Sequence, residues 1–491
     1  MKLIKIIIVM VFLLSYVGVQ GQVNEARQQY EKFRKQARTQ YNDFRNEANR
    51  KYAEFLKQAW EQYNILPAIE RPKDEQVPPI VMPEEDLNKP IEDTPITIED
   101  VVEPPTPDPM PVPVAPIREQ PIEEKYMNFT YYGTKCKVRF NYKHHIFKLK
   151  GCKSDNIASA WLELSDEKYD NLIRDCLLLR SEMKLNDWAY LLLLRNMSEK
   201  FLGKGNEAKL LMAYIYSQSG YQMKLGVDKD DRNLYLLYSS KHNIYGKAYF
   251  SVANEHYYPF DCEESELLIS GADFPEAQPL SLQIIHEMQL SNANSEVREL
   301  ISKRYPEIKI QSKVNKNLIT FYNGYPASEY NDNFMTKWSI YANTPMTAKV
   351  KSEIYPTFKE KLKGLRQKEA AERLLNWVQT AFVYELDDKV WGQDRAFFAE
   401  ESLYYPFCDC EDRSILFSRL VRDLLGLKVI LVYYPGHLAT AVHFTDDVKG
   451  DYILLNKEKY VVCDPTYIGA PVGNTMRNMD NSSATVILLK N

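Results

Sequence analysis

The sequence predicts an α+β fold, because helical periodicity and short strand-like runs alternate along its C-terminal part. Between Ile415 and Leu425 apolar residues recur at steps of three and four, which is the period of a helix with one buried face. Runs rich in β-branched and aromatic residues follow at 428–433, 452–455 and 460–463. At 491 residues the chain is long enough for two or three domains.

Residues 1–21 have the features of an export signal. Lys2 and Lys5 precede an apolar run at 6–14, and Val19-Gln20-Gly21 offers a small-residue cleavage site. This apolar run is too short for a comfortable membrane span, and no later run approaches one. We therefore expect a mature protein that begins near Gln22, lies in the periplasm or outside the cell, and has no membrane span.

Residues 22–66 are predicted to form one long helix with an eleven-residue repeat. The repeat consists of Ala26, Tyr30 and Phe33, then Ala37, Tyr41 and Phe44, then Ala48, Tyr52 and Phe55, and finally Ala59 and Tyr63. Steps of four, three and four keep these side chains on one stripe of the helix. An oligomerising coiled coil, and hence self-association, is the expected role. The alternative is a single solvated helix held by charge pairs four residues apart.

Residues 67–122 form a proline-rich, acidic stretch that we expect to be a disordered spacer. Fifteen of the chain's 26 prolines lie between 67 and 121. Such a composition cannot bury enough apolar surface to order itself, and proline favours extended conformations. The formal net charge of the whole chain is only −5, so no basic footprint of nucleic-acid binding is present.

Residues 123–304 are predicted to be an α+β domain with strands at 131–150, helices at 166–219 and a helical connection at 264–304. Aligning Gly220 with Gly426 places the helix of this domain on the helix near the C-terminus. Strand-like runs follow both glycines in the same order. We expect a degenerate copy of the following domain, whose alternative is an unrelated α+β domain with a chance spacing of glycines.

Residues 305–491 form the last predicted domain, with strands at 308–322 and 337–350 and a long helix at 360–380. A loop at 387–398 is rich in Trp, Phe and Arg. Loops of this kind that precede a nucleophile commonly line a substrate cleft.

Three residues of this last domain have the order of a thiol triad. Cys410 falls in the first turn of the 415–425 helix, where unpaired N–H groups and the helix dipole favour a thiolate. His437 opens a strand after Gly436, and Asp464 ends another strand. An imidazole can take the thiol proton while a carboxylate fixes its tautomer. The alternative for Cys410 is a buried structural thiol or half of a disulfide.

The chain has seven cysteines, so at least one thiol is unpaired within a monomer. Cys136 and Cys152 flank strand-like sequence and could pair. Residue types also permit a metal site made of Cys408, Cys410, Cys463 and His437. The Cys-x-Cys spacing argues against zinc, whose sites usually carry Cys-x-x-Cys, so neither metal nor cofactor is expected.

The motifs of residues 365–470 resemble those of the transglutaminase-like superfamily, the papain-like Cys-His-Asp thiol enzymes, in their secreted bacterial form. The segment Cys410-Glu411-Asp412-Arg413-Ser414 is similar to that family's Cys-x-Asp-x-(Ala/Ser), and Gly436-His437 and Asp464-Pro465-Thr466 match its later motifs. The helix that ends near Tyr384 has a counterpart in the family. One departure is Ala439, where many members carry Trp.

This resemblance implies a papain-like core at 305–491 whose catalytic residues are Cys410, His437 and Asp464. It implies a thioester formed on Cys410 from the amide bond of a peptide or protein substrate. Transfer to water would make a peptidase or amidase, which we prefer to transfer to an amine. Trp391, Tyr384 and Asp412 are candidate cleft or oxyanion residues, although Trp391 could equally pack in the core. The competing hypothesis is a catalytically silent binding or scaffolding protein.

Overall fold

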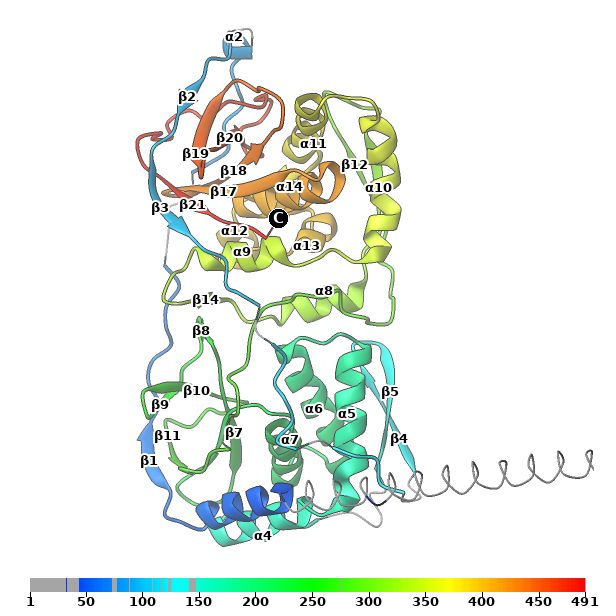
Figure 1. Ribbon diagram of the computed structural model, residues 1–491, viewed down its shortest axis with the longest axis vertical. Coiled ribbons are helices and arrows are strands. Elements are labelled where there is room, and N and C mark those ends of the chain that lie inside the picture. Colours follow the sequence, from blue (N-terminus) through cyan, green and yellow to red (C-terminus); the bar gives the residue numbers. More distant parts are fainter. Residues whose placement is uncertain are drawn as a thin grey trace, which may run out of the picture.

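The computed structural model describes residue 32 and residues 44–490, apart from 73–76, 88, 108, 116, 122–124, 141–146 and 275. The predicted export signal lies outside the described residues, and so do the first two copies of the eleven-residue repeat apart from Phe44. The chain has a mixed α+β architecture with two halves that follow one another along the long axis (Figure 1). Among the described residues, no helix is both long and apolar enough to cross a membrane.

The first half consists of a hairpin, a group of helices and a six-stranded antiparallel sheet in the described part of the chain. The hairpin pairs β4 (Tyr126–Tyr131) with β5 (Thr134–Arg139). The helices are α4 (Ser154–Leu164), η1 (Glu167–Tyr169), α5 (Asp170–Glu182), α6 (Asp187–Leu202) and α7 (Asn206–Gln218). The sheet has the order β1-β11-β6-β7-β10-β9, with bounds Glu61–Asn64, Glu266–Ile269, Met223–Val227, Leu234–Ser239, Glu255–Pro259 and Phe250–Val252. A short strand β8 (His242–Ile244) pairs with β14 (Ser328–Tyr330) of the second half.

The second half repeats this plan. Its hairpin pairs β12 (Arg298–Ile301) with β13 (Lys309–Ser312). Its helices are α8 (Lys316–Asn323), α9 (Thr336–Asn343), α10 (Ala348–Leu362), α11 (Gln367–Ala381), α12 (Asp387–Trp391), α13 (Ala399–Tyr404) and α14 (Cys410–Leu425). Its mixed sheet, in the described residues, has the order β2-β19-β20-β18-β17-β21-β3, with bounds Thr94–Pro95, Asp451–Leu455, Glu458–Cys463, His437–His443, Lys428–Tyr434, Ala484–Ile487 and Ile98–Val102. The two-residue strands β15 (Val383–Tyr384) and β16 (Phe407–Cys408) pair in parallel as a separate sheet.

The two halves place equivalent elements in equivalent positions. In the first half α5 packs on β5, α6 packs on β4, and α6 and α7 pack together; in the second half α10, β13, α11, β12 and α14 make the same set of contacts. Strands β11-β6-β7-β10-β9 of one sheet then correspond in order to β21-β17-β18-β20-β19 of the other. Each of α7 and α14 packs on its own sheet, against β7 and against β17 and β18 respectively.

Several predicted elements differ from the structure. The strands expected within 308–322 and 337–350 are largely helices α8, α9 and the start of α10, and 264–304 is mostly irregular chain with two short strands rather than helix. The long helix expected at 360–380 is two helices, because the chain turns at Gly364, whose φ is +78°. These runs are rich in aromatic and β-branched residues, whose weak local preference is overridden by tertiary packing.

The predicted helix of residues 22–66 also ends earlier than expected. Residues 44–56 are helical, but Glu61–Asn64 form strand β1 on the edge of the first sheet. The helix lies against the first half, where Tyr52 stacks on Phe274 with ring centroids 4.4 Å apart. Leu56 is fully buried there. The buried face of this helix therefore packs within its own chain and consists of Arg45, Asn49, Tyr52, Ala53 and Leu56, whereas Phe44 and Phe55 of the predicted stripe are exposed.

The described residues of 67–122 are not the free spacer that their composition predicts. Figure 1 shows this segment rising from β1 along the side of the molecule to the second half. Strand β2 pairs with β19, and β3 pairs in parallel with β21. Met82 and Ala115 are buried. The segment cannot build a core of its own, but it is ordered by hydrogen bonds to the edges of sheets that the rest of the chain supplies.

Candidate active site

Cys410 is the first residue of α14, as the sequence predicts. Asp412, the third residue of this helix, accepts a hydrogen bond from the backbone N–H of Asp409 to its Oδ2 at 3.3 Å. The second carboxylate oxygen of Asp412 accepts from the backbone of Phe397 at 2.7 Å. Asp412, a candidate cleft residue on sequence grounds, is thus fully buried and engaged in holding the helix start.

The first turn of α14 is fixed against the strand that begins with His437. The Ser414 hydroxyl donates to the Leu438 carbonyl at 2.7 Å. The backbone N–H of Leu438 also acts on the Cys410 sulfur, where it favours the thiolate. Cys410 and His437 line the same cavity. The fold therefore brings together the two residues that the sequence places 27 positions apart.

His437 and Asp464 form a directly bonded pair. The distance from His437 Nε2 to Asp464 Oδ2 is 2.8 Å, and both side chains are buried. The other Asp464 oxygen accepts from the backbone N–H groups of Thr466 at 2.8 Å and Tyr467 at 3.1 Å. His437 Nδ1 is buried and has no hydrogen-bond partner in the described part of the chain. A carboxylate thus fixes the orientation of the ring while the second nitrogen stays available.

Gln379 of α11 holds the loop that carries Asp464. Its buried amide nitrogen lies 3.0 Å from the Asp464 carbonyl, 2.8 Å from the Tyr467 carbonyl and 3.1 Å from the Ala470 carbonyl. The amide oxygen accepts from the backbone of Gly469 at 3.2 Å. One side chain therefore binds four backbone groups of a single loop, and nothing in the sequence marks Gln379 for this role.

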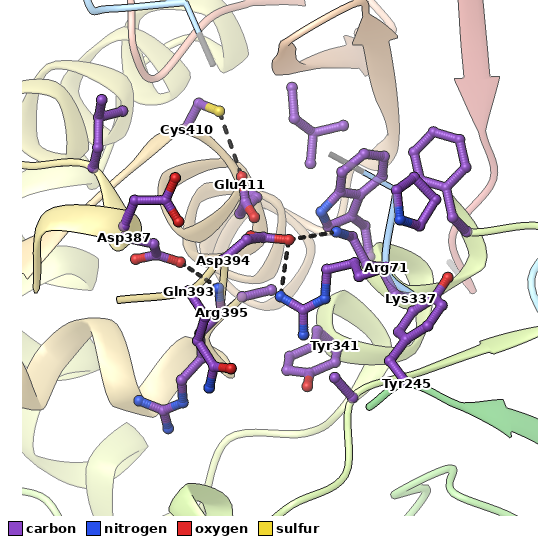
Figure 2. A pocket seen from close by; sticks show the side chains of 18 of the residues that line it. Arg71, Tyr245, Lys337, Tyr341, Asp387, Gln393, Asp394, Arg395, Cys410 and Glu411 are labelled. Carbon is purple, nitrogen blue, oxygen red and sulfur yellow. Dashed lines mark hydrogen bonds and ion pairs between the residues drawn. The ribbon is translucent and has the colours of Figure 1, made fainter. Parts of the chain in front are cut away.

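Cys410 and His437 open onto a cavity of about 860 Å³ between the two halves of the molecule. Most of its lining comes from the second half, and Tyr245 and Gly246 come from the first. Figure 2 shows the cysteine at one end and a group of charged side chains, including Asp387, Asp394, Lys337 and Arg71, across the middle of the cavity. The 387–398 loop supplies several of these side chains, in agreement with its predicted place at the cleft.

The charges in this cavity are unevenly paired. Asp394 binds Arg71 at 2.9 Å and Lys337 at 3.2 Å. Burial acts to raise the pKa of Asp394, but the charges of Lys337 and Arg71 outweigh it and lower this pKa to about 2. The pKa of Asp387 rises to about 8, because this carboxyl is buried and lies near Glu411. Burial and the neighbouring Asp409 raise the pKa of Glu411 well above its usual range.

The thiol of Cys410 does not have the depressed pKa that its position at a helix start predicts. Burial, and then the nearby carboxylates Glu411 and Asp409, raise its pKa well above the ordinary value. Cys410 Sγ lies 3.6 Å from Glu411 Oε2, as Figure 2 shows. Desolvation of a buried thiolate exceeds the favourable effect of the helix end. These effects favour the neutral thiol of Cys410 over the thiolate in the resting site.

The aromatic candidates from the sequence lie outside the cavity lining. Trp391 packs against Phe397 and Tyr405, with ring centroids 5.9 and 4.8 Å away, so its role here is packing. Tyr384 lies beneath the Arg413 guanidinium at 5.2 Å. Trp338 lines the cavity instead, and its indole nitrogen is buried without a partner among the described residues. Trp338 was not identifiable as a cavity residue from the sequence, because residues 337–350 were expected to form a strand.

Two groups of side chains lie close enough together to share a metal ion, Asp409-Cys410-Glu411 and Asp387-Asp394-Glu411. The carboxylates of Asp387, Asp394 and Glu411 lie within 4.8 Å of one another, but Arg71 and Lys337 already neutralise Asp394. The set of Cys408, Cys410, Cys463 and His437 does not form such a group in the described residues. All seven cysteines are free thiols, so Cys136 and Cys152 do not pair.

No family model, curated protein or solved structure matches this chain.

Proposed function

We propose that this chain is an exported thiol enzyme of the transglutaminase-like superfamily that acts on amide bonds of peptides or proteins. The observation that carries the proposal is the His437–Asp464 pair. One ring nitrogen is held by a buried carboxylate at 2.8 Å, and the other has no hydrogen-bond partner among the described residues. His437 lines the same cavity as Cys410. A buried imidazole with this division of roles is what a thiol nucleophile requires.

In the proposed reaction His437 Nδ1 takes the Cys410 proton as the sulfur attacks the amide carbonyl carbon. The resulting oxyanion can be stabilised by N–H donors at the helix start and by the indole of Trp338. The tetrahedral intermediate then expels the amine, which receives the proton from His437, and a thioester remains on Cys410. Because the resting thiol is neutral, His437 acts as a general base during the attack and no thiolate needs to be preformed.

The fate of the thioester defines the activity. Attack by water, with His437 again as the base, gives a carboxylate and regenerates the thiol, which is peptidase or amidase chemistry. Attack by a primary amine gives a crosslink. Hydrolysis is the outcome that we prefer, because water is the acceptor present in excess.

We also propose that the first half is a degenerate copy of the catalytic core. The shared order of strands and helices supports this. Thr440 lies opposite Cys463, just before Asp464, while Leu237 lies opposite Pro259, just before Phe260. By this register Leu234 takes the place of His437 and Phe260 the place of Asp464. Apolar residues at both positions leave the first half without the chemistry of a thiol triad.

The first residue of α7 refines the predicted alignment. The alignment of Gly220 with Gly426 puts Lys204 opposite Cys410. Helix α7 begins at Asn206, so Asn206 occupies the position of the nucleophile at the helix start. Gly220 and Gly426 still end both helices with positive φ, at +94° and +65°. Asn206 has an amide where Cys410 has a thiol, which agrees with a first half that has no catalytic activity.

The competing function is a binding or scaffolding protein in which the triad is unused. The deep burial of Cys410, which is 2% exposed, favours this alternative. A peptide-based electrophile that acylates or alkylates only activated cysteines distinguishes the two. The mature protein should be labelled at Cys410, and Cys410→Ala should abolish the label whereas Cys408→Ala should retain it. The same labelling is measured with Arg71→Glu, which breaks the ion pair between Arg71 and Asp394 across the cavity. Absence of labelling at Cys410 in both proteins, or transfer of the label to Cys408, would refute the enzyme proposal.

A further inference from the structure

Two described pieces of the proline-rich segment, residues 69–72 and 77–82, run along the candidate active site; together they are called the cleft strap below. Its first piece enters the cavity. The Ile69 carbonyl accepts from the Gly246 N–H at 3.1 Å, which fixes the strap to the first half. Arg71 then places its guanidinium 2.9 Å from Asp394 and 5.8 Å from the centre of the Tyr245 ring. Figure 2 shows Arg71 pointing toward Asp394 in the centre of the cavity.

The second piece of the strap lies on the backbone next to the catalytic residues. The Val77 N–H donates to the Gly436 carbonyl at 2.9 Å, immediately before His437. Further on, Ile468 donates to the Ile80 carbonyl and accepts from the Met82 N–H, both at 2.9 Å. Ile468 belongs to the same loop as Asp464. The strap therefore contacts the loop of the general base and the loop of its carboxylate.

These contacts are those of an extended polypeptide in a binding groove. Backbone hydrogen bonds hold such a peptide without regard to sequence, and pockets for individual side chains give specificity. Here one side chain of the strap, Arg71, enters the cavity and pairs with a carboxylate. Asp394 stays ionised at neutral pH because its pKa is lowered to about 2, so it accepts a guanidinium or an ammonium.

Resting on the proposed function, we propose that the cavity binds an extended polypeptide substrate with a basic side chain on Asp394, and that the cleft strap occupies this place in the resting chain. Asp394 is then a specificity-determining residue, and Arg71 imitates the substrate. Lys337 balances part of the Asp394 charge from the wall of the cavity, at 3.2 Å, and is not displaced with the strap. A substrate enters when the strap leaves, and the ion pair between Arg71 and Asp394 opposes its departure.

Peptide binding tests this inference separately from catalysis, because it can be measured with Cys410→Ala as the background in every protein. The probe is a fluorescein-labelled synthetic peptide with the sequence of residues 66–84. Arg71→Glu weakens the internal strap by setting a carboxylate against Asp394, so the peptide should bind about tenfold or more tightly than to the background protein. Arg71→Gln should have a smaller effect in the same direction. Lys89→Glu changes an exposed residue that pairs with Asp86 beyond the strap, so it should leave binding unchanged.

A second set of binding measurements tests the role of the negative charge on Asp394. Adding Asp394→Asn to Arg71→Glu should remove most of the gained affinity for the peptide with arginine. A peptide that carries glutamate in place of this arginine should bind weakly to all the proteins. Unchanged affinity after Arg71→Glu, or equal binding of the arginine and glutamate peptides, would overturn the inference. If the peptides bind as expected while Cys410 fails to react with the electrophile, the peptide-binding inference is supported and the proposed thiol chemistry is refuted.

Discussion

The hydrogen bond from Ser414 Oγ to the Leu438 carbonyl, at 2.7 Å, joins the helix of the candidate nucleophile to the strand of the candidate base. Both residues are buried. Ser414 lies one helical turn after Cys410, and Leu438 directly follows His437. The bond therefore sets how the helix start meets the strand, and with it the approach of the thiol to the imidazole.

The first prediction concerns which histidine is the base. His437→Ala should lower the rate of Cys410 acylation by the peptide electrophile by about 10²- to 10⁴-fold, the usual contribution of a general base. His443 is the matched control, because it ends the same strand and its Nδ1 lies 3.0 Å from the Lys459 carbonyl. His443→Ala should change the rate less than about twofold by the same reasoning. Equal losses in the two variants would contradict the assignment.

The parts of this site that follow from local sequence were predictable. Helix α14 and its end at Gly426 follow from periodicity and a glycine with positive φ, and the strand runs after it are β17 to β20. The raised pKa of the Cys410 thiol was not predictable, because sequence shows a helix start but not the burial of Glu411 and Asp409 around it. Local signals identify residues, whereas their electrostatic environment depends on the whole fold.

The ordered conformation of the proline-rich segment, residues 67–122, could not be predicted from the sequence for a related reason. Its composition correctly indicates that it has no core, but the strands that receive β2 and β3 lie hundreds of residues later in the chain. The contact of Arg71 with Asp394 joins residues 323 positions apart. Gln379 likewise looks like any polar residue of an amphipathic helix until the Asp464 loop is placed against it.

The second prediction concerns Gln379 as a positioning residue. Gln379→Leu keeps the side-chain size but leaves the carbonyls of Asp464, Tyr467 and Ala470 without their shared donor. The free energy of unfolding should fall by about 1–3 kcal/mol, the cost of buried polar groups left unsatisfied. Acylation of Cys410 should slow, and Gln379→Glu at a pH that keeps its carboxyl neutral should recover part of the rate. A variant that loses stability with full acylation rate would show a purely structural role.

The third prediction is a pH dependence of stability from Glu400, which is 1% exposed. Burial raises the pKa of this carboxyl from 4.5 to about 7. Below pH 4.5 the Glu400 carboxyl is protonated in both the folded and the unfolded chain. Between pH 4.5 and 7 the unfolded chain loses the proton first, so the contribution of Glu400 to stability falls as pH rises, and above pH 7 the loss is constant.

Glu400→Gln removes this titration. Its free energy of unfolding relative to the wild type should therefore increase from pH 4.5 to pH 7 by roughly 3 kcal/mol, at about 1.4 kcal/mol per pH unit. Denaturant unfolding at pH 5, 6, 7 and 8 measures it. Glu360→Gln is the control, because that side chain is 72% exposed and should show no such trend. A difference independent of pH would rule out a buried neutral carboxyl at position 400.

The last prediction concerns the helix of residues 44–56, which the sequence assigns to self-association and the structure packs against its own chain. Asn49 is fully buried in this contact. Its amide exchanges hydrogen bonds with Gln218, at 3.0 and 3.2 Å, and its oxygen accepts from the Trp161 indole at 2.9 Å. Asn49→Leu should lower the free energy of unfolding by about 2–4 kcal/mol, because Gln218 and Trp161 lose buried partners. Glu54→Leu, at an exposed position of the same helix, should cost less than about 1 kcal/mol.

Sedimentation of the same proteins separates the two roles of the helix. If the helix mainly oligomerises, a leucine at position 49 would increase association without lowering the stability of the monomer. That result would contradict docking of the helix within its own chain.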